Sequence, residues 1–114
     1  MSEFTYEKIE FKVSMRDVDG NEYKETVSPA YLVGGTGLDW IELVVHRHLQ
    51  FPKNWEVSDR SSGCAFKTSA HGITTRDEAV KIVILSVKRI GQKAYEKQTK
   101  QAKKRVEGLT EKGG

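Results

Sequence analysis

Cysteine and long hydrophobic runs are what this sequence of 114 residues has least of. Its one cysteine, Cys64, excludes an internal disulfide and a zinc cluster built from cysteines. No apolar run is long enough to span a bilayer, and the first residues lack the basic and apolar pattern of a secretory signal. We therefore expect a cytoplasmic protein that makes no membrane contact.

The positive charge is distributed unevenly along the chain. Residues 1–87 hold 10 Lys and Arg against 13 Asp and Glu, a net charge of −3, whereas residues 88–114 hold 9 against 3, a net charge of +6. Such asymmetry is typical of nucleic-acid contact, and a solvated tail that maintains solubility is the alternative. We divide this single domain into an α+β globular body, residues 1–90, and a basic helical extension with a flexible C-terminal tail, residues 91–114.

The longest helical pattern in the sequence covers residues 75–106. Thr75 can accept the backbone N–H of Glu78, and the Glu78 side chain can reach back, which is a capping box. Apolar residues then recur at helical spacing and predict a stripe that faces the core. They are Val80, Val83, Ile84 and Val87, widened by Ala79, Ile82 and Leu85. Gly91 costs about 1 kcal/mol inside a helix, or it ends a first helix there.

The second half of this pattern is strongly basic. Five residues spaced +4, +4, +3 and +4 fall on one side of a continuous helix. They are Arg89, Lys93, Lys97, Lys100 and Lys104. One unbroken helix over residues 75–106 would be about 48 Å long at ~1.5 Å per residue, longer than a body about 35 Å across. We therefore expect the basic end to project, with Tyr95 able to stack on a base.

The remaining pattern predicts a small single-domain α+β fold with the order ββαββα. Alternating apolar and polar residues over 9–27, with Asp19-Gly20 at the turn, predict an antiparallel hairpin. A helix is expected from Leu38 to Gln50, followed by short strands at Trp55–Val57 and Cys64–Thr68. The predicted antiparallel sheet is packed by two helices, of which the C-terminal one is long and basic.

Two patterns are candidate ligand sites. Gly34-Gly35-Thr36-Gly37 precedes the expected helix, where free N–H groups attract anions, but it lacks the spacing of a nucleotide-binding loop, so a flexible capping loop is preferred. His46 and His48 are two residues apart, which on a helix prevents them from sharing a metal ion. We expect His48 at the edge of the core and His46 at the surface. No metal and no cofactor is predicted.

One stretch faintly resembles the pterin carbinolamine dehydratases, small α+β enzymes with a His-His-Pro…Trp…His signature and a Gly-Leu-Thr-x-x-Asp helix start. The residues that carry the resemblance are His46-Arg47-His48, Trp55 and Thr68–Thr74 with Asp77, about 30 residues in all. Arg47 separates the two histidines, no proline follows them, and a hairpin stands where the family has its leading helix. The resemblance therefore assigns no residue a role.

The sequence contains no catalytic triad, carboxylate pair or nucleophile motif, so we predict no enzymatic activity. We expect a small binding protein that contacts nucleic-acid phosphates through the basic helix, with little sequence selection. The alternative is a regulator or inhibitor that binds one host protein, of the kind carried by phages and other mobile elements. Either could act as a monomer or a homodimer.

Overall fold

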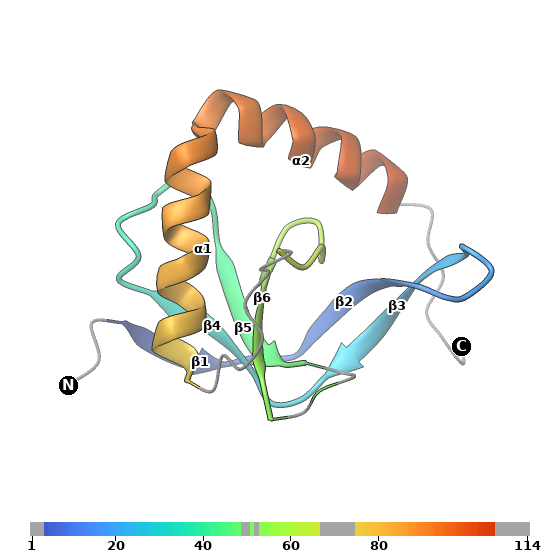
Figure 1. Ribbon diagram of the computed structural model, residues 1–114, viewed down its shortest axis with the longest axis horizontal. Coiled ribbons are helices and arrows are strands. Elements are labelled where there is room, and N and C mark those ends of the chain that lie inside the picture. The colour runs from blue at the N-terminus through green and yellow to red at the C-terminus, as the bar shows by residue number, and fades with distance from the viewer. Residues whose placement is uncertain (1–3, 49–50, 52, 67–74, 107–114) are drawn as a thin grey trace.

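The computed structural model describes residues 4–48, 51, 53–66 and 75–106, and over these residues six strands precede two helices (Figure 1). The elements are β1 (Thr5–Lys8), β2 (Phe11–Arg16), β3 (Glu22–Val27), β4 (Ala30–Gly34), β5 (Leu43–Arg47), β6 (Trp55–Asp59), α1 (Arg76–Ile90) and α2 (Gln92–Val106). The expected α+β class, with an antiparallel sheet and two helices, is confirmed. The order ββαββα is wrong, because every described strand precedes the helices.

The strands form a four-stranded antiparallel sheet in the order β1-β4-β5-β6 and a separate β2-β3 hairpin. The hairpin turns at Gly20, whose φ of 85° lies in the region that glycine adopts without strain. The Asp17 carboxylate accepts the backbone N–H groups of Asp19 and Asn21, each at 2.9 Å, which stabilises the turn. The predicted hairpin is therefore confirmed, whereas residues 5–8 form a strand that the pattern did not reveal.

The expected helix from Leu38 to Gln50 is wrong, because Leu43–Arg47 forms the inner strand β5. Leu43 and Val45 face a cluster shared with α1, while Val44 faces the β2-β3 hairpin. A strand covered on both faces has a continuous apolar run instead of an alternating one, and such a run is ambiguous between strand and helix. Burial on two sides, rather than amphipathic helix formation, explains this run of apolar residues.

Helix α1 crosses one face of the four-stranded sheet, over β5 and β6 (Figure 1). The Thr75 side chain accepts the backbone N–H of Glu78 at 3.3 Å, which confirms the predicted N-cap. The predicted core stripe is buried as expected, at Ala79, Val80, Val83, Ile84 and Val87. Leu85 does not widen it, because 65% of that residue is exposed.

Trp55 and Val57 lie in β6, as predicted. Beyond the following turn, Ala65 bridges to Ser58 and the Phe66 N–H donates to the Val57 carbonyl at 2.8 Å. This pairing confirms part of the expected partner strand, and its last residues, from 67 on, lie outside the described residues. Neither α1 nor α2 is long and apolar enough to cross a membrane.

Candidate nucleic-acid interface

The basic segment does not continue the axis of α1, because the chain turns at Gly91. Gly91 has φ 88° and ψ 154°, a conformation that residues with a side chain rarely adopt, and its N–H donates to the Val87 carbonyl at 3.0 Å. A Cβ at this position would meet nothing within 4 Å, so backbone conformation rather than space favours glycine. Of the two alternatives for Gly91, helix termination is the one observed. The continuous helix is wrong.

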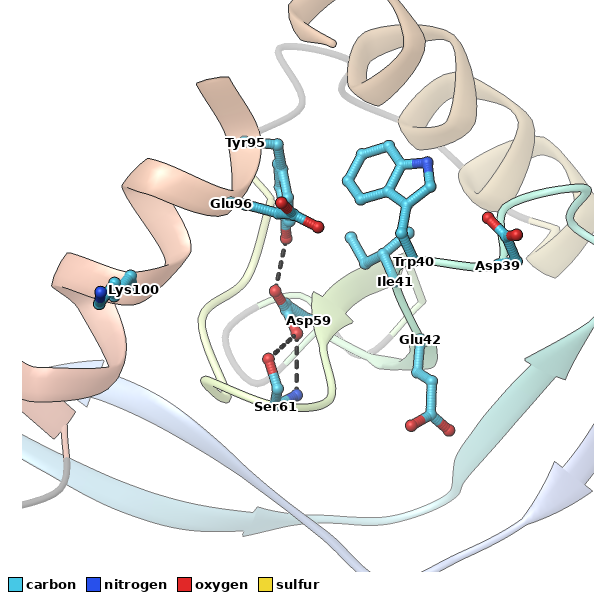
Figure 2. Close-up of a pocket in the computed structure, with 9 residues that line it drawn as sticks. All are labelled: Asp39, Trp40, Ile41, Glu42, Asp59, Ser61, Tyr95, Glu96 and Lys100. Atoms are coloured by element: carbon cyan, nitrogen blue, oxygen red, sulfur yellow. Dashed lines mark hydrogen bonds between the residues drawn. The ribbon is translucent and has the colours of Figure 1, made fainter. Parts of the chain in front are cut away.

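Tyr95 anchors α2 to the body. The Tyr95 hydroxyl donates to Oδ2 of Asp59 at 2.6 Å, and the two residues are only 8% and 3% exposed. Oδ1 of Asp59 accepts the N–H and hydroxyl of Ser61 at 2.8 and 2.7 Å, so both carboxylate oxygens have partners (Figure 2). The Tyr95 ring contacts the Trp40 ring edge-on, with 5.4 Å between the ring centroids, and stacks on the Phe66 ring, with 5.9 Å between the centroids. Tyr95 is therefore a packing residue and not a platform for a base.

This anchor turns α2 across the end of the body (Figure 1). The molecule measures 40 × 33 × 25 Å, so its longest dimension is shorter than the unbroken helix would be. The expected projecting arm is replaced by a helix that Tyr95, at the end of its first turn, holds on the body.

The described lysines of α2 lie on the face opposite Tyr95. At about 100° per residue, Lys93, Lys97 and Lys100 lie roughly 160°, 160° and 140° around the axis from Tyr95. All three are exposed, and none forms an ion pair with another side chain in the described part of the chain. The face that carries Lys93 and Lys97 therefore presents ammonium groups to solvent away from the body. Lys100 is also exposed, but it lies beside the cavity that Tyr95 and Asp59 line.

Arg89 and Lys104 stand apart from these three lysines. Arg89 is exposed in the last turn of α1, where it and Lys88 also complement the negative end of the helix dipole. Because the chain turns at Gly91, Arg89 is not part of one continuous stripe. Lys104 belongs to α2, but its side chain is outside what the structure describes.

A cavity of about 440 Å³ lies beside α2 (Figure 2). The described residues that line it include four acidic ones, Asp39, Glu42, Asp59 and Glu96, and one basic one, Lys100. These carboxylates reduce the positive potential near Lys100 and leave the side of Lys93 and Lys97 the more attractive to an anion. The described residues contain no group of three or more His, Cys, Asp or Glu side chains arranged to hold a metal ion.

His46 lies on β5 and His48 just beyond its end. The prediction that His46 lies at the surface is wrong, whereas His48 is partly buried, as predicted. His46 is fully buried, and its ring nitrogens contact the Arg47 carbonyl at 3.0 Å and the Ser58 hydroxyl at 2.8 Å. His48 is partly exposed and lies 3.4 Å from a carboxylate oxygen of Glu56. His71, the third histidine, is outside the described residues.

The His46–Ser58 pair has the contact of a catalytic dyad but lacks access to a substrate, because neither residue is exposed. Burial lowers the pKa of His46, and the nearby His48 lowers it further, although the hydrogen bond to the Arg47 carbonyl acts in the opposite direction. Burial also raises the pKa of Glu56, against the effect of His48. The neutral His46 ring therefore joins β5 to β6 as a structural link.

The glycine-rich loop does not lead into a helix, so no helix dipole is available there to bind phosphate. Thr36 instead accepts the backbone N–H of Leu38 at 3.2 Å, and the chain continues into β5. No family model, curated protein or solved structure matches this chain. The resemblance to the pterin carbinolamine dehydratases thus has no support.

Proposed function

We propose that this protein is a non-enzymatic binding protein that contacts nucleic-acid phosphates through the outer face of α2. The supporting observation is the opposition between Tyr95, which holds one face of the helix on the body, and the exposed lysines on the other face. Lys93, Lys97 and Lys100 form the described part of this contact. Arg89, in the last turn of α1, and Lys104, farther along α2, are the other two residues that we propose to reach phosphate.

Ammonium groups on one helix face suit backbone phosphates, because they supply charge without a pattern that distinguishes bases. Three phosphate contacts on a duplex predict a slope of about −2.7 for log K against log salt concentration, and five predict about −4.5. The slope therefore reports how many of the five proposed residues reach phosphate.

The deciding experiment reverses the charge of Lys97 and Lys100 to Glu and measures duplex binding by mobility shift over a range of salt concentrations. Binding should be lost or strongly weakened, and any residual salt slope should be smaller by about 1.8. The control is Lys12→Glu with Lys24→Glu on the β2-β3 hairpin, which changes the net charge by the same amount. It should bind the duplex clearly more strongly than the α2 double variant. Equal loss in both variants would indicate a general charge effect and contradict a contact at α2.

A regulator or inhibitor that binds one host protein is the second candidate. The observation that favours it is the exposure of apolar side chains on α1, where Leu85 is 65% and Ile90 44% exposed. These two residues lie about 140° apart around the helix axis, so each offers a separate apolar contact to a protein partner. A protein partner that is retained through high salt and nuclease treatment would support this candidate against the first one.

A further inference from the structure

Three half-buried aromatic rings form a row on the sheet face that α1 packs on. The row lies near the first residue of the helix, where the rings are only partly covered. Tyr6 of β1 contacts Tyr31 of β4 at 6.3 Å between ring centroids, and Tyr31 contacts Trp55 of β6 at 6.2 Å. All three lie at the margin of the core cluster beneath α1. Because each ring is only partly covered, the row adds aromatic surface to the outside of the molecule.

Two guanidinium groups lie against this row. The guanidinium carbon Cζ of Arg76 lies 4.2 Å from the ring centroid of Tyr6, 4.9 Å from that of Tyr31 and 5.8 Å from that of Trp55. Arg47 lies 3.9 Å from the centroid of Trp55 and donates to a backbone carbonyl at 3.2 Å, which orients its planar group. The rings stabilise both cations.

The position of Arg76 is unfavourable in one respect. It is the first residue of α1, where the helix dipole presents partial positive charge. Asp77 is nearby and accepts a hydrogen bond from the Tyr6 hydroxyl, so the row with its arginines and this aspartate has a formal charge of +1. An excess of positive charge beside aromatic rings fits an anionic ligand with flat groups.

We infer that this row, formed by Tyr6, Tyr31 and Trp55 with Arg47 and Arg76, stacks bases of single-stranded nucleic acid. Bases stack on aromatic rings and on guanidinium planes alike, and the arginines also supply charge for the adjoining phosphates. A duplex keeps its bases stacked inside and offers the row only phosphates. The inference rests on the proposed function and identifies a single strand as the ligand that uses both contacts, whereas a duplex reaches only the lysines of α2.

The row and the lysines of α2 lie at opposite ends of α1, which is about 22 Å long at ~1.5 Å per residue. They can therefore be tested separately. In a Trp40→Phe variant, Trp55 is the one remaining tryptophan and reports directly on the row. The Phe substitution keeps an aromatic ring beside Tyr95, and unchanged circular dichroism and melting temperature would verify that the fold is retained.

The first measurement is Trp55 fluorescence during titration with three probes. These are single-stranded oligothymidylate of about 20 nucleotides, a duplex of equal length, and heparin as a polyanion without bases. Oligothymidylate should quench Trp55 strongly, whereas duplex and heparin should bind with little quenching. The inference is overturned if oligothymidylate binds without quenching Trp55, if it does not bind, or if heparin quenches Trp55 equally.

The second measurement uses side-chain variants. Trp55→Leu should weaken oligothymidylate binding by about 5- to 150-fold, the range for loss of one stacked base, with heparin affinity unchanged. Arg47→Lys keeps the charge but loses the planar group, so it should also weaken oligothymidylate binding selectively. If both variants bind oligothymidylate like the wild type, or lose heparin affinity in parallel, the stacking contact is refuted.

Failure of the proposed α2 contact and failure of the stacking contact give different results. If Lys97→Glu with Lys100→Glu leaves heparin and duplex binding unchanged, the α2 contact is wrong whatever Trp55 does. If that double variant loses heparin and duplex binding while Trp55 is not quenched in the Trp40→Phe variant, the α2 contact stands and the stacking inference fails.

Discussion

The two helices have equal length but are held in different ways. Each contains 15 residues, and α1 buries five side chains against the sheet, whereas Tyr95 is the one buried side chain among those described on α2. The helix dipole of α1 is complemented at both ends, by Asp77 and Glu78 and by Lys88 and Arg89, while the first turn of α2 has no acidic residue.

This difference separates scaffold from binding surface within one continuous stretch of sequence. Helix α1 derives its stability from tertiary packing, which is the main source for most helices in proteins. Among the described side chains of α2, Tyr95 alone is buried, so the exposed ones, Lys93 and Lys97 included, remain available to a partner. The comparison also identifies where each helix can be disrupted independently of the other.

The largest effect is expected from Val83→Ala in α1. Val83 is fully buried, and removing two methyl groups from a packed core should lower the free energy of unfolding by about 2–3 kcal/mol. Chemical denaturation measures this change. Leu85→Ala is the matched control, and because Leu85 is mostly exposed its effect should stay within about 0.5 kcal/mol. Equal losses would contradict the assignment of the buried face.

A smaller and more local effect is expected from Tyr95→Phe. This change removes the hydroxyl that donates to the buried Asp59 carboxylate, at a cost of roughly 1.5–2 kcal/mol. Relative to the wild type, amide hydrogen exchange should speed up more in α2 than in α1. The reason is that the lost hydrogen bond joins α2, and not α1, to the body. Tyr31→Phe removes a hydroxyl from a half-buried ring on the sheet and should leave α2 unaffected. Protection of α2 that is unchanged in Tyr95→Phe would show that something else holds this helix.

The smallest effect is expected from pH, which changes the stability of the sheet through His46 and not the contact between Tyr95 and Asp59. His46 has a lowered pKa when folded, so below the unfolded value of about 6.5 the unfolded chain binds more protons and stability falls with falling pH. One such group contributes at most about 1.4 kcal/mol per pH unit.

Denaturation of the wild type and of His46→Gln between pH 8 and pH 6 tests this dependence. The variant should be less stable throughout but should have the flatter profile. His48 and Glu56 are present in both proteins, and the raised pKa of Glu56 acts in the opposite direction, favouring the folded state as pH falls. Parallel profiles would exclude His46 as the source of the pH dependence.

Local patterns predicted those elements whose causes are local. The Thr75 cap and the stripe from Ala79 to Val87 follow from contacts between residues three or four positions apart, and the Asp19-Gly20 turn follows from the preferences of its own residues. Strand β5 was predicted as a helix because its burial arises from two different layers. Neither layer is visible in the run Leu43–His46 itself.

The candidate interface divides in the same way. The spacing of Lys93, Lys97 and Lys100 is a property of the sequence, and it places them on one side of any helix they form. Which side faces solvent was not predictable, because it depends on the contact between Tyr95 and Asp59, which are 36 residues apart. The aromatic row likewise collects Tyr6, Tyr31 and Trp55 from three strands through sheet pairing, and their sequence spacing contains no signal of it.

By itself, the sequence determined the charge asymmetry and the helix start at Thr75, and it left open whether Gly91 interrupts the final helix. These depend on residue chemistry and on interactions within one turn. Tertiary structure alone decided that α2 turns back to the body, that His46 is buried, and that rings from distant strands meet. Those outcomes depend on long-range contacts whose free energy exists only once the sheet has assembled.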